Sequence, residues 1–328
     1  MNIVPNKSIE KFNFFQLFKK GSFISLVLLI LIFSIYASTA SNVFTVFSMN
    51  NLLNNSIALA LAAIGLTLVI LTGGTDFSVG SVIILANVII ASQGAVTGGE
   101  VAANLTVVFL TCIGVGMVNG FFISYVGIQP IATTLATMIM CQGIALVVMP
   151  APGGSVSPLI YSGLTSTVFG ILPMALVILV LAGFIWILIK KTSFGTHIYA
   201  IGKDERASIQ AGINVKRVKF LVYVVASLFY ALAGVMYSAQ TGSGDPTAGS
   251  LFTLLVFAAV ALGGTQFVGG KGGAFGSIVG ALILTLLQKM LFSVGVSSFY
   301  TSIFQGFVLI AAIMLGRVSA KINKWGEL

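Results

Sequence analysis

Asp76 is the residue whose type and position first suggest chemistry. It lies within residues 73–81, a glycine-rich stretch that separates two long apolar segments. A carboxyl group there could handle a substrate or a proton, because ionisable groups at membrane depth are costly and usually functional. Asp76 also lies two residues before Ser78, where it could instead form a local turn or cap the next helix through backbone N–H groups. From the residues alone, both interpretations remain open.

Seven neutral amides lie in or beside the apolar segments, and an amide both donates and accepts hydrogen bonds. Together with Asp76, they are the candidate residues of a substrate pathway: Asn54, Asn55, Asn87, Asn119, Gln142, Gln288 and Gln305. This set suits a neutral, polyhydroxylated solute better than a charged one. Each amide could equally hold two helices together, through hydrogen bonds worth about 0.6 kcal/mol on average in membranes.

The sequence indicates no catalytic residue and no metal site. His197 is the only histidine, the acidic residues are spread over the chain with no clustered pair to hold a metal or share a proton, and both cysteines lie inside apolar runs. Lys271 follows two glycines, but Thr265 and Gly272 occupy positions where a nucleotide-binding P-loop needs Gly and Ser or Thr. We therefore predict that the chain is not an enzyme and binds no cofactor, and that any ATP is used by another polypeptide.

The composition places these residues in a membrane protein. Of the 328 residues, 58% are hydrophobic and only 7% are charged, and the mean hydropathy is +1.10. A soluble domain carries roughly 25% charged residues. A soluble enzyme, a nucleic-acid-binding domain and a disordered chain are therefore excluded.

The apolar runs predict an all-α, polytopic membrane protein with about ten transmembrane helices and short loops. The predicted spans are residues 23–40, 52–72, 82–95, 101–125, 130–149, 171–189, 220–240, 251–267, 274–292 and 299–315. The predicted organisation is an arm at 1–20, a transmembrane domain at 21–316 that contains a charged loop at 190–219, and a tail at 317–328.

Most basic residues lie in three polar stretches, at residues 7–20, 190–219 and 317–324. Ten spans place all three on one side, which the positive-inside bias identifies as the cytoplasm. Both termini are then cytoplasmic. Eight or nine spans with one re-entrant segment remain an alternative, as does a cleaved signal peptide at residues 23–40.

Two glycine-rich breaks resemble each other. Residues 73–80 and 263–270 both begin Gly-Gly-Thr and have Phe at the fifth position. Transporters are often built from two related halves with interrupted helices at matching places. A shared glycine-rich composition explains the likeness equally well.

The charged loop at 190–219 carries signals for a short helix. Asp204 can cap its start and Gly212 suits the position after its end. Ala207 and Ala211 are small, so this helix could press closely against another protein. The alternative is a solvated linker whose lysines only set the topology.

Motifs along most of the chain are similar to those of one family. They are residues 73–81 (GGTDFSVGS), Asn119–Gly120, Pro130 with 134–138 (TLATM), 192–202 (TSFGTHIYAIG), Ala207 with 211–213 (AGI), and 263–265 (GGT) followed by Gly269–Gly270. Over about residues 51–316 the chain resembles bacterial ABC-type sugar permeases of the ribose/galactoside/xylose class, which are related to branched-chain amino acid permeases.

The resemblance implies the permease subunit of an ATP-binding-cassette importer in the bacterial inner (plasma) membrane, moving a small neutral solute such as a monosaccharide by alternating access. The implied partners are a second permease chain, identical or related, a cytoplasmic ABC ATPase, and a periplasmic or lipid-anchored solute-binding protein. Membrane lipid surrounds the assembly, and no nucleic acid is involved. The ATPase would dock on the cytoplasmic coupling helix and its flanks, at Gly195, Gly202, Asp204, Glu205, Ala207, Ala211 and Gly212.

The chain departs from the family pattern in five places and leaves the solute unidentified. The departures are Thr75, Phe77, Lys203, Ser208 and the stretch 251–262. A rival from another mechanistic class is a secondary carrier coupled to protons through Asp76, and a passive channel is a third alternative.

Overall fold

The computed structural model describes residues 21–40, 42–297, 300, 303–304, 306–307 and 310. The predicted arm at 1–20, the predicted tail at 317–328 and the pathway candidate Gln305 lie outside the described residues, as does most of the predicted span at 299–315.

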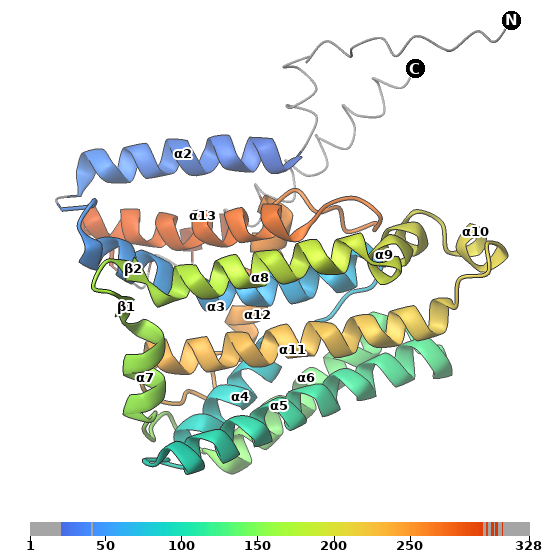
Figure 1. The fold of residues 1–328 in the computed structure, drawn as a ribbon, viewed down its shortest axis with the longest axis horizontal. Helices are drawn as coiled ribbons and strands as arrows, with labels where there is room; N and C mark the ends of the chain where they lie inside the picture. Colours follow the sequence, from blue (N-terminus) through green and yellow to red (C-terminus); the bar gives the residue numbers. More distant parts are fainter. Residues whose placement is uncertain are drawn as a thin grey trace, which may run out of the picture.

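The described chain is a bundle of helices that lie side by side, which confirms the all-α class (Figure 1). The helices are α2 Gly21–Thr39, α3 Val46–Leu71, α4 Val79–Ser92, α5 Gly98–Phe121, the π-helix η1 Phe122–Val126, α6 Pro130–Val148, α7 Pro158–Thr165, α8 Met174–Lys191, α9 Ser193–Lys203, α10 Glu205–Gln210, α11 Val215–Thr241, α12 Gly249–Leu262 and α13 Ala274–Ser293. In the described part, the strands are β1 Thr167–Val168 and β2 Leu172–Pro173, an antiparallel pair in which Thr167 lies opposite Pro173.

Within the described residues, six helices are long and apolar enough to cross a membrane: α3, α5 with η1, α6, α8, α11 and α13. The predicted spans through residue 292 each fall on a helix, but ten full-length spans are not confirmed. The helices α4 and α12 have 14 residues each. At 1.5 Å per residue they are about 21 Å long, short of the ~30 Å hydrocarbon layer. Both are short because a glycine-rich break adjoins each of them.

The helix α3 forms the centre of the bundle, and from Ser56 to Leu71 every residue is buried. Alanine and glycine on α3 let neighbouring helices approach closely, as is common in membrane bundles. A Cβ atom added to Gly65 would lie 2.8 Å from the carbonyl oxygen of Ala226 on α11. By contrast, less than a third of the membrane-length part of α5, α6 and α8 is buried, and each of these helices has exposed apolar residues, which suits contact with lipid.

The two glycine-rich breaks end their helices with the same hydrogen-bond pattern. After α3, Gly73 has φ +79° and its N–H donates to Ile70, while the N–H of Gly74 donates to Val69. After α12, the second glycine of the pair, Gly264, takes the left-handed position with φ +77°. The N–H of Gly264 donates three residues back and that of Thr265 five residues back. The geometry of the two breaks is therefore alike, but it is displaced by one residue relative to the likeness in sequence.

We predict that Gly80→Ala destabilises the bundle. A Cβ atom at Gly80 on α4 would lie 2.0 Å from the carbonyl oxygen of Gly249 and 2.3 Å from Oγ1 of Thr253, both on α12. Overpacking of this kind costs about 1–3 kcal/mol. The free energy of unfolding of the detergent-solubilised protein should fall by that amount. Gly143→Ala on α6 is the control, since nothing lies within 4 Å of its added Cβ; equal midpoints of thermal unfolding would contradict the prediction.

Candidate functional site

The helices α9 and α10 lie at one end of the bundle, opposite α7 and the β1–β2 pair (Figure 1). The side chain of Asp204 accepts a hydrogen bond from the N–H of Ala207 at 3.0 Å and so caps α10. Gly212 has φ +81°, and the N–H of Ile213 donates back to Ser208 at 3.1 Å. The predicted N-cap and C-terminal glycine are therefore confirmed.

The helix α9 was not predicted, since the sequence analysis assigns its residues only to the charged loop at 190–219. Thr192 caps it by accepting a hydrogen bond from the N–H of Gly195 at 3.3 Å. Ile198 and Ile201 are buried against the bundle while the opposite face is exposed. Phe194, Ile198 and Ile201 follow the i, i+4, i+7 spacing of an amphipathic helix, and this signal could have revealed α9.

A shallow groove of about 260 Å³ runs between α9 and α10. We call it the coupling groove, and it is lined by Ala200, Lys203, Asp204, Ala207, Ser208, Ala211 and Ile213. The methyl groups of Ala207 and Ala211 are exposed and leave room for a side chain from outside. Three predicted coupling residues, Asp204, Ala207 and Ala211, therefore meet in one depression.

The other predicted coupling residues hold the loop in shape. Glu205 forms an ion pair with Lys219 on α11 at 2.7 Å, which ties α10 to the bundle. Gly195 lies in the first turn of α9, against the end of α8, where an added Cβ would be 2.3 Å from the carbonyl oxygen of Ile189. Gly212 ends α10 as described above.

Gly202 makes the closest backbone contact of α9. An added Cβ would lie 1.9 Å from the carbonyl oxygen of Leu71, at the end of α3, and 2.4 Å from the nitrogen of Gly270, in the loop before α13. The N–H of Gly270 in turn donates to the carbonyl oxygen of Leu71 at 3.0 Å. We call Leu71, Gly73, Gly202, Gly269 and Gly270 the glycine junction. It joins α9 to both glycine-rich breaks by backbone alone.

A tyrosine on α9 reinforces this junction. The hydroxyl of Tyr199 donates to the carbonyl oxygen of Gly272 at 2.9 Å. Partial burial raises the pKa of this hydroxyl, so it keeps its proton and remains a donor at neutral pH. The ammonium of Lys190 lies 5.9 Å from the centre of the Tyr199 ring.

Asp76 lies in the packed interior, 2% exposed. Its Oδ1 accepts hydrogen bonds from the N–H and the hydroxyl of Ser78, at 2.9 and 2.5 Å, in a local turn before α4. The hydroxyl of Ser78 accepts from Asn119 on α5 at 3.0 Å, and Asn119 accepts from Thr137 on α6 at 2.8 Å. Tyr230 of α11 lies beside the carboxylate. The first break is thus linked through Asp76 to three other helices.

The amide candidates do not gather in one place. Asn54 donates to the carbonyl oxygen of Thr165 at 3.0 Å and links α3 to α7. Asn87 is fully buried, donates to Ser238 and to the carbonyl oxygen of Ser243, and accepts from the N–H of Asp245, all at 3.0 Å. These two make the helix-to-helix bonds of the alternative interpretation.

The remaining candidates divide between three places. Asn119 belongs to the Asp76 network, and Gln142 is half-buried on α6. Asn55 and Gln288 meet in a polar cavity.

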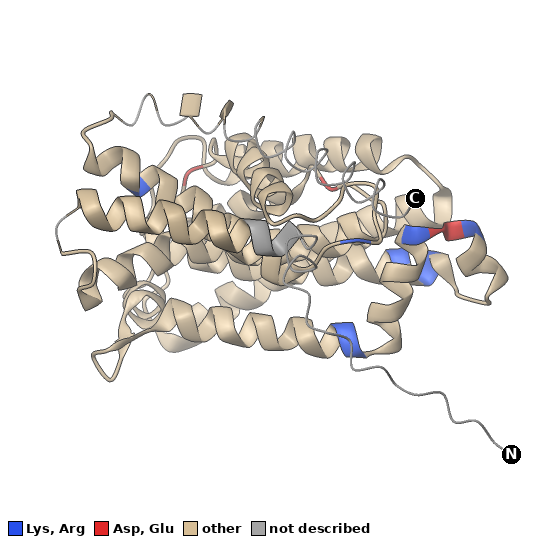
Figure 2. Cartoon of the chain, turned by 90° about the horizontal axis from the view of Figure 1, so that it is seen from above, with Lys and Arg blue, Asp and Glu red and all other residues tan. Residues whose placement is uncertain are grey.

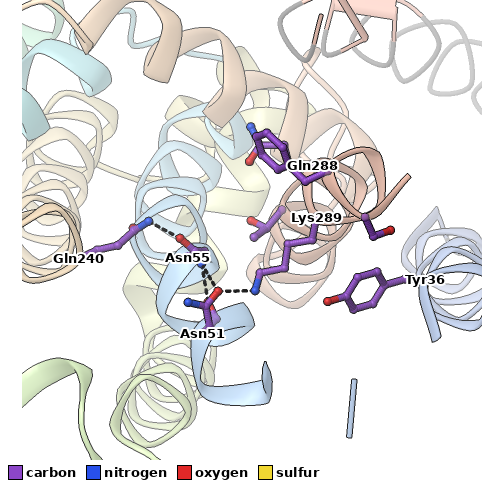
Figure 3. A pocket seen from close by; sticks show the side chains of 9 residues that line it. Tyr36, Asn51, Asn55, Gln240, Gln288 and Lys289 are labelled. Atoms are coloured by element: carbon purple, nitrogen blue, oxygen red, sulfur yellow. Dashed lines mark hydrogen bonds between the residues drawn. The ribbon is translucent and has the colours of Figure 1, made fainter. Parts of the chain in front are cut away.

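We call this cavity the amide pocket, and its volume is about 480 Å³. Its lining comes from α2, α3, α11 and α13: Tyr36, Asn51, Asn55, Gln240, Thr285, Gln288, Lys289, Phe292 and Ser293 (Figure 3). Asn51, Gln240 and Lys289 line the pocket but are not among the predicted pathway residues. The spacing of Asn51 and Asn55, four residues apart, places them on one helix face and could have indicated the first.

The chain matches the family described as "Branched-chain amino acid transport system / permease component" over residues 48–313. It belongs to this permease family. The resemblance inferred from the motifs is therefore confirmed, and the chain is a multi-pass membrane protein. No solved structure matches it.

Individual relatives of this permease cover most of its length. It is similar to the ribose import permease protein RbsC of Bacillus subtilis, with 37% identity over 81% of this chain and 84% of the relative. The corresponding RbsC of Escherichia coli K12 is 36% identical over the same shares. The galactose/methyl galactoside import permease protein MglC of Salmonella typhimurium is 31% identical over 82% of this chain and 85% of its own. These relatives are transport permeases and not enzymes.

We predict that Gly202→Ala opens the glycine junction of this permease. The added methyl group would push α9 away from Leu71, and such overpacking costs about 1–3 kcal/mol. The N–H of Gly270, which donates to Leu71, should then exchange with deuterium about tenfold faster, the factor that corresponds to ~1.4 kcal/mol of local opening. Hydrogen exchange with mass spectrometry measures this. Gly143→Ala is the matched control, and unchanged exchange at Gly270 in Gly202→Ala would refute the junction.

Proposed function

We propose that this chain is the permease subunit of an ATP-binding-cassette importer that moves a monosaccharide across the bacterial inner membrane. The observation that carries the proposal is the similarity to ribose and galactose import permeases over more than four fifths of both chains. The neutral amides of the amide pocket and of the Asp76 network agree with a solute that is hydroxylated and uncharged.

The proposed energy source is a separate ATPase that docks in the coupling groove. The groove is exposed, its alanines leave space, and the Lys and Arg residues of the described chain gather mainly around it (Figure 2). Behind the groove, Gly202 contacts both glycine-rich breaks. Force applied to α9 and α10 would therefore reach the end of α3 and the loop between α12 and α13 directly. In this proposal the permease binds no cofactor and the ATPase uses the ATP.

The proposed assembly has ten membrane segments per chain, with α4 and α12 as short segments and both termini in the cytoplasm. This orientation places α9 and α10 in the cytoplasm and the amide pocket on the outer side. A second permease chain completes the pore, and a periplasmic or lipid-anchored binding protein delivers the sugar. The exposed apolar faces of α5, α6 and α8 supply surface for lipid and for the second chain.

Transport in proteoliposomes tests the importer. The permease, reconstituted with an ABC ATPase and a sugar-binding protein taken from its own genome, should take up labelled ribose or galactose only with ATP. Uptake driven by a pH gradient without ATPase would establish the carrier instead. Downhill flux through the permease alone would establish a channel.

The variant Asp76→Asn is a control within the same assay. An amide oxygen can still accept the two hydrogen bonds from Ser78 but cannot carry a proton. The importer therefore predicts that ATP-driven uptake by Asp76→Asn stays within about threefold of the wild type. A neutral amide oxygen accepts weaker hydrogen bonds than a carboxylate, but both bonds from Ser78 are kept. The carrier predicts that uptake by this variant is abolished.

A bulky residue in the coupling groove should block the ATPase. We expect Ala207→Trp to reduce co-purification of the ATPase by about tenfold or more. The indole fills the part of the groove that the ATPase would occupy, and overpacking of this contact costs about 1–3 kcal/mol. Gln210→Trp is the matched control, since Gln210 is exposed on the same short helix but does not line the groove. Equal recovery of the ATPase with both variants would contradict docking in the groove.

A further inference from the structure

The amide pocket lies at the opposite end of the bundle from the glycine junction. Asn51 and Asn55 are near the start of α3, whereas Leu71 in the junction is its last residue. Likewise, Gln240 is near the end of α11 and Lys289 near the end of α13, both far from the coupling groove along their helices. The pocket therefore lies where a solute delivered from outside would first meet the permease in the proposed orientation.

Hydrogen bonds organise the wall of the pocket (Figure 3). Gln240 donates to the side-chain oxygen of Asn55, and Asn55 donates to the side-chain oxygen of Asn51 at 2.9 Å. Lys289 donates to the same oxygen of Asn51. Three helices thus hold four polar groups in one connected row, so these groups are oriented before any ligand arrives.

Part of the hydrogen-bonding capacity of the pocket is unused by the described residues. Gln288 makes no hydrogen bond to another described residue, and no described carboxylate lies within ion-pair distance of the Lys289 ammonium. Lys289 has three donor positions, of which the bond to Asn51 occupies one. A half-buried ammonium and a half-buried amide are costly without partners, which indicates that an outside group completes them.

The lining determines the chemistry of that group. Among the described residues, it offers amides, hydroxyls and one ammonium, with aromatic rings from Tyr36 and Phe292 and no carboxylate. Hydroxyl oxygens can accept from Lys289 and Gln288 and donate back to amide oxygens, while an aromatic ring covers the C–H face of a sugar. The volume of about 480 Å³ falls within the range of pockets for small ligands, roughly 300–1,000 Å³.

We propose that the amide pocket is a solute-receiving site that binds a neutral, hydroxyl-rich solute through Asn51, Asn55, Gln288 and Lys289. This inference rests on the proposed function and adds a site within the permease itself, separate from the binding protein. The solute forms the hydrogen bonds that Gln288 and Lys289 lack.

Protection of a cysteine from alkylation tests the site without requiring transport. In Ser293→Cys, which lines the pocket but is not one of the four proposed binding residues, a maleimide that does not cross membranes should label the pocket from outside. The native Cys112 and Cys141 are buried and should react little. Ribose, galactose and methyl galactoside are the probes. At twice its Kd, a bound sugar should slow labelling about threefold, because the free fraction falls to one third.

Two controls define the result. Phe47→Cys is exposed near the same end of α3 but does not line the pocket, so its labelling should not respond to sugar. Phe292→Cys provides a second exposed pocket position that also leaves the four proposed binding residues intact, which keeps the test valid when Ser293→Cys does not fold.

Substitution of the lysine shows which group recognises the solute. In the Ser293→Cys background, Lys289→Met should remove the protection by sugar and Lys289→Arg should retain it. Absence of protection by every neutral sugar, or protection by a sugar phosphate alone, overturns the proposal. Protection without ATP-driven uptake would instead overturn the importer and leave the pocket standing, so the two failures are distinguishable.

Discussion

A helix that ends inside a packed membrane protein leaves backbone N–H and C=O groups that water cannot reach, and the protein must satisfy them. The end of α3 and the loop after it show how this is done. The carbonyl oxygen of Leu71 accepts from Gly270, and that of Thr75 accepts from Tyr223 at 3.1 Å. The N–H of Phe77 donates to Thr134, also at 3.1 Å. Each partner comes from a different part of the chain, so the first break is stable only when the whole bundle is assembled.

This requirement explains why the glycine junction occupies a single point. Two breaks and α9 approach through backbone atoms, and only glycine permits contacts in which a Cβ would lie about 2 Å from a neighbouring carbonyl, as at Gly202. A close-packed contact of this kind moves as a unit, because interiors are dense and deform little. The coupling groove is on the outer surface of the same short helices, one layer away. The coupling groove and the two helix breaks are therefore adjacent.

The helices α3, α11 and α13 run from the coupling end to the amide pocket. They are also among the most buried helices of the described chain. Their shared core lies between the coupling groove, with its charged residues and small alanines, and the amide pocket, with its neutral amides. An importer needs these two chemistries at opposite ends, one for a protein partner and one for a solute.

The sequence by itself determined the membrane class and the helical fold through its hydropathy, and the family through its motifs. It also determined the caps of α10, because Asp204 and Gly212 act on backbone groups a few residues away in the chain. Only the tertiary structure decided that α12 ends at Leu262, before the second break, and that Gly202 meets both breaks. The tertiary structure also distinguishes two roles among the amides. Asn55 and Gln288 share a pocket. Asn54 and Asn87 form hydrogen bonds to other helices. An amide has the same local pattern in either role. Its partner is chosen by the packing of distant helices, and that choice has no signal in the residues beside it.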